Sequence, residues 1–469
     1  MFGERGITLI ALIITIVVLL VLAGVTIANI TGGDSVIDKA GQAKNETALS
    51  AKVEEVHVAI AQSMSSAFNE ELDMSKLQTN LGKLSGVTLS TEVFPAKVEI
   101  LGEPYIIYSD GELFKGSNGN TRVPIPDGFV ASGATGENDV STGLVIYEGT
   151  EPVTDSNVAT ARTTRNQFVW VPVGGNIKYD RDTTISNSYQ SHYNAYSDWT
   201  DPDGASNVIS VAKYGGFYIG RYEAGWAQKE NGDTYETDTT TVSKNDTSKL
   251  PVCRKGYAGW NYITQANSII VCENMYKNNE SVKSQLIDSY AWDATVNWFN
   301  KTKDCKAYNK ITNSKTYGNY NDNSSSITAN TLYAIPIYSN TWLNPISYRK
   351  SSTPVDTSYR NKSIAQSDLG NYTNETSGSS FTTRLELSTG ASDDYSLNNV
   401  YDMAGNFWEW TTEVGKRNST SATATKYAVY RGGCFNSSGS SIPVIYRNAY
   451  YSASYTHIAF GFRPVLYLK

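Results

Sequence analysis

The residues whose types best fit a chemical role lie near the C-terminus, in residues 436–460, and that role is recognition. Tyrosines there offer large amphipathic contact area at low rotamer cost, and the polar residues between them offer adaptable hydrogen bonds. Strands of a buried core would alternate more strictly and carry fewer serines. We therefore predict a ligand-binding surface made of Asn436, Ser437, Ser440, Tyr446, Asn448, Tyr450, Tyr451, Ser454, Tyr455 and His457.

The same residues 436–460 have an unusual alphabet. They contain no Lys, Gln, Glu, Met or Trp, which are the residues that codons ending in C cannot encode. This pattern is typical of AAC-type codons randomised at their adenines. A tyrosine-rich surface that arose by chance is the alternative interpretation.

Metal and redox chemistry has few ligands to draw on in this chain. Three histidines and four cysteines are spread over 469 residues, and none of the histidines are grouped. The cysteines could form two disulfides in any of three pairings, or remain thiols. With 39 basic and 46 acidic residues the formal charge is -7, which argues against a nucleic-acid-binding protein. The three histidines are His57, His192 and His457, and the four cysteines are Cys253, Cys272, Cys305 and Cys434.

Short aromatic strands and Gly- and Asn-rich turns must position the predicted surface. Residues 168–173 and 216–220 are apolar enough for buried or half-buried strands. Residues 289–299 place three large apolar side chains on one helical face. Residues 306–380 are dominated by Asn, Ser, Thr and Tyr, which predicts a long insertion with local structure; disorder is the alternative.

Five motifs in this part of the chain resemble the formylglycine-generating-enzyme family, a variant of the C-type lectin fold. The resemblance covers roughly residues 121–469 and implies a mixed α/β head with much irregular structure. The motifs are FVWVP at 168–172, GFYIGRYE at 216–223, NVYDMAGNFWEW at 399–410, RGGCF at 431–435 and GFR at 461–463.

The catalytic ligands of that family do not align with equivalent residues here. Its oxidase members bind copper with two cysteines after the Arg-Gly-Gly motif, and those positions fall on Ser437 and Ile442. Copper(I) requires soft thiolates, which a hydroxyl and an aliphatic group cannot replace. A related branch uses three histidines for iron, and the three here are dispersed. We therefore expect no enzyme activity, with a membrane-tethered oxidase of this type as the alternative.

The same resemblance implies a structural calcium ion. In the family this ion lies under the Gly-Asn-x-Trp-Glu-Trp turn, and residue-by-residue transfer gives the side chains of Asp402 and Glu409 and the carbonyl groups of Gly405 and Phe407. Hard oxygen ligands suit Ca²⁺. Internal pairing of Glu409 with an arginine such as Arg463 is the alternative.

The alphabet of residues 436–460 also resembles the variable proteins of diversity-generating retroelements. Many of those proteins carry this lectin-like fold, with a variable segment that ends before a Gly-Phe-Arg such as Gly461–Arg463. The resemblance implies a diversified binding surface.

The N-terminus contains a 24-residue apolar run without a charge, residues 7–30. At about 1.5 Å per residue it spans roughly 36 Å, enough for a hydrocarbon core of about 30 Å. With its short polar leader it resembles a type IV prepilin, which implies a prepilin peptidase that cuts between Gly6 and Ile7 and packing with other pilin subunits. Ala11 stands where most major pilins carry Glu, as in some minor pilin-like proteins. A plain membrane anchor is the alternative.

Residues 31–120 are predicted to form a pilin-like stalk. Apolar residues recur at three- and four-residue spacing from Val53 to Phe68, and short alternating runs follow at 96–100 and 105–108. A helix on a small antiparallel sheet is the economical fold for 34–115. The predicted fold class is thus α+β: leader 1–6, apolar helix 7–30, stalk 31–120 and lectin-like head 121–469.

Together these features predict a surface-displayed, pilin-like adhesin or receptor-binding protein. Residues 7–30 would hold it in the membrane or a pilus on the extracellular side of the cell envelope. Its head would bind an external protein or glycan. Besides the tethered oxidase, a structural minor pilin without ligand binding is the alternative.

Overall fold

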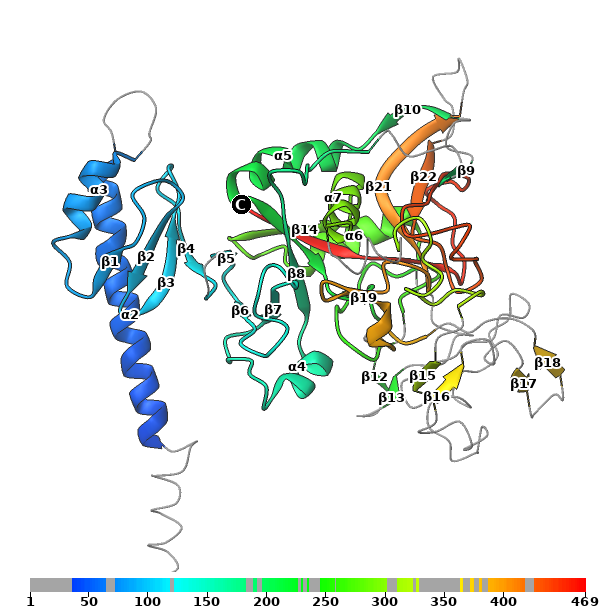
Figure 1. The fold of residues 1–469 in the computed structure, drawn as a ribbon, viewed down its shortest axis with the longest axis horizontal. Helices are drawn as coiled ribbons and strands as arrows, with labels where there is room; N and C mark the ends of the chain where they lie inside the picture. Colours follow the sequence, from blue (N-terminus) through cyan, green and yellow to red (C-terminus); the bar gives the residue numbers. More distant parts are fainter. Residues whose placement is uncertain are drawn as a thin grey trace, which may run out of the picture. The chain divides into compact units, whose positions relative to one another are not determined.

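The computed structural model (Figure 1) describes sixteen parts of the chain, and the chain divides into two compact units, residues 1–124 and 125–469. The described residues are 36–64, 72–118, 122–182, 189–191, 196–226, 229–230, 234–235, 245–257, 259–301, 310–323, 326–328, 363–365, 372–374, 379–381, 387–417 and 426–469. The predicted apolar helix 7–30 and the predicted cleavage site at Gly6 and Ile7 lie outside them. Within the described parts, no helix has the length and apolar character needed to cross a membrane.

In the described residues of the N-terminal unit, two helices pack on an antiparallel sheet, whereas a single helix on such a sheet was predicted for 34–115. Helix α3 begins after Asp73, whose carboxylate accepts hydrogen bonds from the main-chain N–H groups of Ser75 and Lys76 at 2.9 and 3.1 Å. Val56 and Ile60 of α2 join the buried cluster, so the predicted apolar face does pack inward. The elements are α2 (Val36–Ser63), α3 (Met74–Leu81), β1 (Val87–Leu89), β2 (Ala96–Ile100), β3 (Glu103–Ile107), β4 (Leu113–Gly116) and β5 (Pro124–Ile125), with sheet order β1-β2-β3-β4-β5.

A six-stranded antiparallel sheet forms the base of the C-terminal unit. Its order is β14-β25-β11-β8-β7-β6, so the last strand of the chain is inserted between two earlier ones. Tyr218 pairs with Leu466 on one side and with Trp170 on the other. The predicted strands at 168–173 and 216–220 are confirmed. The strands are β6 (Phe129–Ala131), β7 (Val145–Glu148), β8 (Gln167–Pro172), β11 (Gly216–Gly220), β14 (Val282–Leu286) and β25 (Pro464–Leu468).

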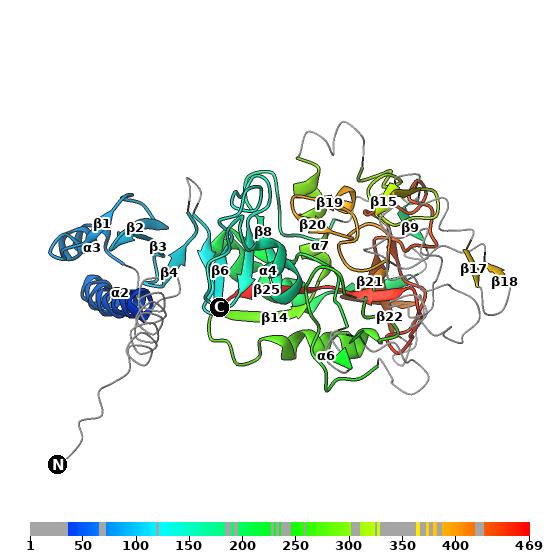
Figure 2. The same cartoon turned by 90° about the horizontal axis from the view of Figure 1, so that it is seen from below.

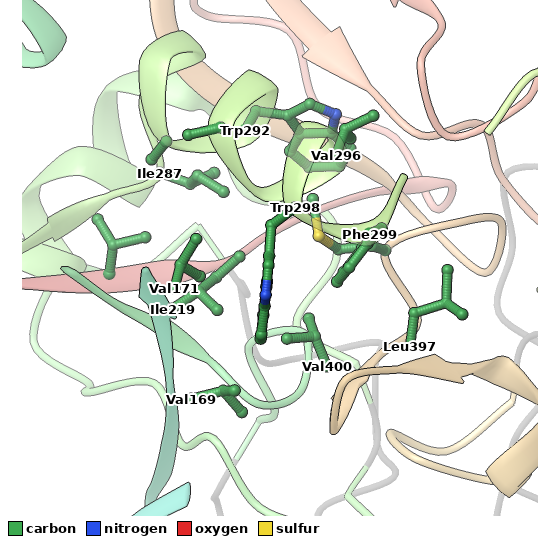
Figure 3. Packing of buried hydrophobic residues seen from close by; sticks show 14 of the residues in the cluster. Val169, Val171, Ile219, Ile287, Trp292, Val296, Trp298, Phe299, Leu397 and Val400 are labelled. Carbon is green, nitrogen blue, oxygen red and sulfur yellow. The ribbon is translucent and has the colours of Figure 1, made fainter. Parts of the chain in front are cut away.

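The described residues of the C-terminal unit form four α-helices, and the predicted helix 289–299 is confirmed as α7. Asp201, Thr264 and Asp288 each cap a helix by accepting a main-chain hydrogen bond through the side chain. Figure 3 shows Trp298 extending from α7 among apolar side chains such as Ile219 and Val400, in one buried cluster. The helices are α4 (Val158–Thr164), α5 (Pro202–Tyr214), α6 (Gln265–Met275) and α7 (Ser289–Phe299).

A second sheet carries the predicted binding segment. Its order is β10-β21-β22-β23-β9, and β24 pairs with β21 in parallel. Residues 436–460, drawn in red, run beside β21 and β22 in both Figure 1 and Figure 2. The strands are β9 (Gln190–Ser191), β10 (Tyr196–Thr200), β21 (Trp408–Arg417), β22 (Lys426–Arg431), β23 (Arg447–Asn448) and β24 (Phe460–Phe462).

Short elements complete the C-terminal unit. Much of the predicted insertion 306–380 lies outside the described residues. The short elements are β12 (Lys229–Glu230), β13 (Thr234–Tyr235), β15 (Ser326–Thr328), β16 (Ser363–Ala365), β17 (Tyr372–Asn374), β18 (Ser379–Phe381), the 3-10 helix η6 (Asp393–Tyr395), β19 (Ser396–Leu397) and β20 (Val400–Tyr401).

Candidate functional site

The predicted binding residues divide into three groups by exposure. Segment 436–460 is described throughout, and it alternates between surface positions and positions that face the interior. Asn436, Ser440, Tyr450 and Ser454 are exposed; Asn448, Tyr451, Tyr455 and His457 are half-buried; Ser437 and Tyr446 are buried.

Four of these residues form an aromatic ladder, namely Tyr450, Tyr451, Tyr455 and His457. The rings of Tyr451 and Tyr455 are stacked, with centroids 3.8 Å apart and planes 8° apart. His457 lies nearly parallel to Tyr455 at 6.1 Å, and Tyr450 meets Tyr451 edge to face at 5.0 Å. Phe460 supports the ladder from below through edge contacts with Tyr451 and Tyr455. Rings held in this way lose little conformational freedom when they bind a ligand.

The ladder contains no Lys, Arg, Asp or Glu side chain. Burial, together with Tyr451, raises the pKa of Tyr455 to about 12. Burial also lowers the pKa of His457, which favours its neutral form. Arg447 is the only Lys, Arg, Asp or Glu in residues 436–460, and its side chain is buried. The segment therefore presents rings and hydroxyl groups to the surface.

Ser437 and Tyr446 occupy interior positions instead of the predicted surface positions. The Ser437 hydroxyl accepts a hydrogen bond from the Cys434 main-chain N–H at 3.2 Å. The Tyr446 ring packs on Trp408 with centroids 5.8 Å apart. Both side chains make internal contacts, so they support the surface without forming part of it.

A buried network of charges anchors the segment from beneath. Asp293 of α7 accepts hydrogen bonds from the guanidinium groups of Arg431 and Arg447 at 2.7 and 2.6 Å. Arg431 also donates to the carbonyl oxygens of Tyr446 at 3.1 Å and Ile445 at 3.3 Å. Asp293 and Arg447 are about 150 residues apart in the sequence. The network therefore connects the middle of the segment to a helix from a much earlier part of the chain. Sequence reasoning missed Arg447, whose position among tyrosines and serines was the available signal.

The two positions that the resemblance aligns with copper ligands hold no thiol pair. Ser437 is buried, Ile442 is half-buried, and Cys434 is a buried thiol 3.4 Å from the Ser437 hydroxyl. Burial raises the pKa of Cys434 and so disfavours the thiolate. Cys253 and Cys272 are also buried free thiols, whereas Cys305 and His192 lie outside the described residues. In the described parts of the chain, no three His, Cys, Asp or Glu side chains gather in a way that could hold a metal ion.

The predicted calcium turn is occupied by protein groups. Both Glu409 oxygens accept hydrogen bonds from Arg463, the shortest at 2.6 Å, and one Asp402 oxygen accepts the Gly390 main-chain N–H at 2.6 Å. The guanidinium already neutralises Glu409, so a cation at this turn would have to displace it. The arrangement therefore fits the Arg463 pairing better than Ca²⁺ ligation by Asp402, Gly405, Phe407 and Glu409, and the calcium site stays a prediction.

Sequence reasoning did not identify Glu223 as a partner of this turn. Its carboxylate accepts hydrogen bonds from the Asn406 side-chain amide at 2.7 Å and from the Phe407 main-chain N–H at 3.1 Å. Burial first, and then Asp402 and Glu409, raise the pKa of Glu223 well above its ordinary value. Glu223 ends one of the five quoted motifs, so a pairing between two such motifs was the signal available.

A match to a known protein family covers the C-terminal third of the chain. Residues 316–467 match the sulfatase-modifying factor enzyme 1-like domain of the FGE-sulfatase family. The chain contains a formylglycine-generating-enzyme-like domain of C-type lectin fold. No curated protein matches the chain.

The formylglycine-generating-enzyme-like match includes the motifs at 399–410, 431–435 and 461–463 and begins after those at 168–172 and 216–223. The sheet nevertheless joins the two parts, because β25 from the matched part pairs with β11 from the earlier part. The family match thus covers the predicted binding segment 436–460 and the turn at 402–409.

Proposed function

We propose that this protein is a surface-displayed, pilin-like adhesin whose lectin-type head binds an external protein or glycan. The observation that carries the proposal is the uncharged, half-exposed aromatic ladder of Tyr450, Tyr451, Tyr455 and His457. It lies on a segment whose backbone is anchored by buried ion pairs. Rigid tyrosines flanked by serines are the residues that recognition surfaces use for contact area and hydrogen bonds.

The N-terminus supplies the route to the cell surface in this proposal. Prepilin peptidase would cut between Gly6 and Ile7, and residues 7–30 would hold the chain in the membrane or among pilin subunits. The alphabet of residues 436–460 supports diversification of the contact surface. A reverse transcriptase gene beside a near-repeat of the codons for residues 431–463, differing at adenines, is the expected genomic context.

Substitution of the most exposed ring tests the binding proposal. Tyr450 is 52% exposed, so Tyr450→Ala should leave the fold intact. Ile209→Ala is the matched control, because Ile209 is 81% exposed on α5 of the same unit. The unchanged protein and the two variants, Tyr450→Ala and Ile209→Ala, would be tested for binding on arrays of glycans and secreted proteins.

We expect Tyr450→Ala to weaken binding at least about tenfold, as for a central aromatic contact, and Ile209→Ala to leave it unchanged. Equal binding by both variants would show that Tyr450 is not part of the contact, and absence of binding by the unchanged chain would favour a structural minor pilin. A tethered oxidase is tested separately by incubating the chain with a cysteine peptide, copper and oxygen. Aldehyde product would overturn the assignment of a non-enzymatic role.

A further inference from the structure

Residues 436–444, the first part of the predicted binding segment 436–460, form hydrogen bonds with a stretch of chain that is distant in the sequence. Residues 314–322, called here the support segment, lie more than 110 positions earlier, as the separation of Asn321 and Asn436 shows. Ser314 is buried, while Asn321 and Asp322 are half-buried.

Most of the hydrogen bonds between the two segments use main-chain atoms of residues 436–444. Asn321 donates to the carbonyl oxygens of Asn436 and Ser437 at 3.0 and 2.9 Å. Ser314 donates its N–H to the Gly439 carbonyl at 2.9 Å, and its hydroxyl accepts the Val444 N–H, also at 2.9 Å. Every residue type except proline supplies these main-chain groups.

Asp322 holds the tip of the loop. One oxygen accepts the Gly439 N–H at 2.7 Å, and the other accepts the Ser440 N–H at 3.3 Å. That second oxygen also accepts the hydroxyls of Ser438 and Ser440 at 2.8 and 2.9 Å. These hydrogen bonds lower the pKa of Asp322 against the opposing effect of burial, so its charged form persists at neutral pH.

Steric contacts divide the loop into fixed and free positions. A Cβ atom at position 439 would lie 2.7 Å from the Tyr320 ring and 2.8 Å from the main chain of Lys315. Glycine is therefore required there, and the buried Ser437 hydroxyl caps Cys434. Asn436, Ser440 and Ser441 are exposed, and the first two were predicted to contact ligand. Because the Ser440 hydroxyl donates to Asp322, the free positions are 436 and 441.

We infer that the support segment fixes the backbone of residues 436–444, so that the side chains at 436 and 441 can change without changing the fold. Ser314, Asn321 and Asp322 act as positioning residues: they determine where the variable side chains point and do not touch the ligand themselves. The recognition role of the loop rests on the proposed function, whereas its mechanical support rests on the contacts given above.

Two measurements on the full chain test the inference without any ligand. The double variant Asn436→Tyr, Ser441→Tyr should keep the melting temperature within about 3 °C, because exposed substitutions away from structural contacts change stability little. In the Asp322→Ala variant, hydrogen–deuterium exchange of peptides covering 436–444 should speed up roughly tenfold, as expected for lost hydrogen bonds to a charged group.

Asp139→Ala is the matched control. Asp139 also accepts a serine main-chain N–H, from Ser141 at 2.7 Å, in an exposed turn of the same unit. It should leave exchange in 436–444 unchanged. Should Asp322→Ala fail to fold, Asn321→Ala removes only one side-chain hydrogen bond to the Asn436 carbonyl and should loosen the same peptides to a smaller extent.

Unchanged exchange at 436–444 in a folded Asp322→Ala variant would overturn the inference, and so would unfolding of the Asn436→Tyr, Ser441→Tyr double variant on its own. A chain that binds no ligand would refute the proposed function and would leave this inference standing.

Discussion

Replacement of Asp293 should destabilise the C-terminal unit strongly. Its side chain is almost fully buried and pairs with Arg431 and Arg447 at 2.7 and 2.6 Å. The carboxylate also accepts the Asp182 main-chain N–H at 2.8 Å. Both guanidinium groups are buried as well, so neither can replace the lost partner with bulk water.

The magnitude follows from what remains after the substitution. Arg447 keeps Glu413 at 3.5 Å, and Arg431 keeps carbonyl oxygens. Glu413 is already shared with Arg181 at 2.9 Å, so the network would hold three arginines against one carboxylate. Removal of one partner from a buried ion pair costs about 3–5 kcal/mol. We expect Asp293→Ala to fall in that range and Asp293→Asn at its lower end, because an amide oxygen still accepts one hydrogen bond.

Intrinsic tryptophan fluorescence during urea and thermal unfolding provides the assay, since Trp292 lies beside the network with Arg431 5.4 Å above its ring. The melting temperature should fall by roughly 5 °C or more. Asp393→Asn is the control: its carboxylate is 80% exposed and 3.4 Å from Lys255, so the cost should stay below about 1 kcal/mol. An Asp293→Asn loss no larger than the Asp393→Asn loss would refute the reasoning.

Three further predictions concern pH, metal and processing. Burial, and then the negative charge of Asp288, raise the pKa of Asp201 to about 7 in the folded chain. Its stabilising contribution is therefore complete below the unfolded pKa near 4 and is lost as pH rises through 7. The melting temperature should be higher at pH 5.5 than at pH 8.5, and Asp201→Asn should reduce that difference. The same difference in melting temperature in the variant would contradict the role given to Asp201. A calcium ion that binds only the folded chain must raise its stability. A melting temperature that is the same with Ca²⁺ and with EGTA would therefore rule out the predicted calcium site at Glu409. Mass spectrometry of surface-extracted protein should find a mature chain that begins at Ile7, and an intact Met1 would rule out prepilin cleavage.

Much of the local structure was predictable because it depends on short-range patterns. The apolar spacing in SYAWDATVNWF predicts a helix, and α7 spans Ser289–Phe299. The alternation in AKVEI predicts a strand, and β2 spans Ala96–Ile100 with buried and half-buried residues in turn. The quoted motifs predicted the lectin-like domain over residues that the family match partly covers.

Contact partners distant in sequence were not predictable in the same way. The exposure of a residue in an irregular loop depends on which segment packs against it, and no local period encodes that choice. The polar, tyrosine-rich segment predicts Ser437 as a surface residue, yet it is buried and bonded to Asn321 and Cys434. Asp322 gave no sequence signal, because its role exists only once residues 438–440 reach it.

The sequence by itself determined the alphabet of the recognition segment: rings and hydroxyls, one arginine and no other formal charge in residues 436–460. The tertiary structure alone decided how that alphabet is used. Two aspartates from distant parts of the chain accept these hydrogen bonds: Asp293 accepts from Arg447, and Asp322 accepts from main-chain N–H groups of the loop. Buried charges and polar groups must find partners, and satisfying them leaves Tyr450 and the exposed hydroxyl groups facing outward.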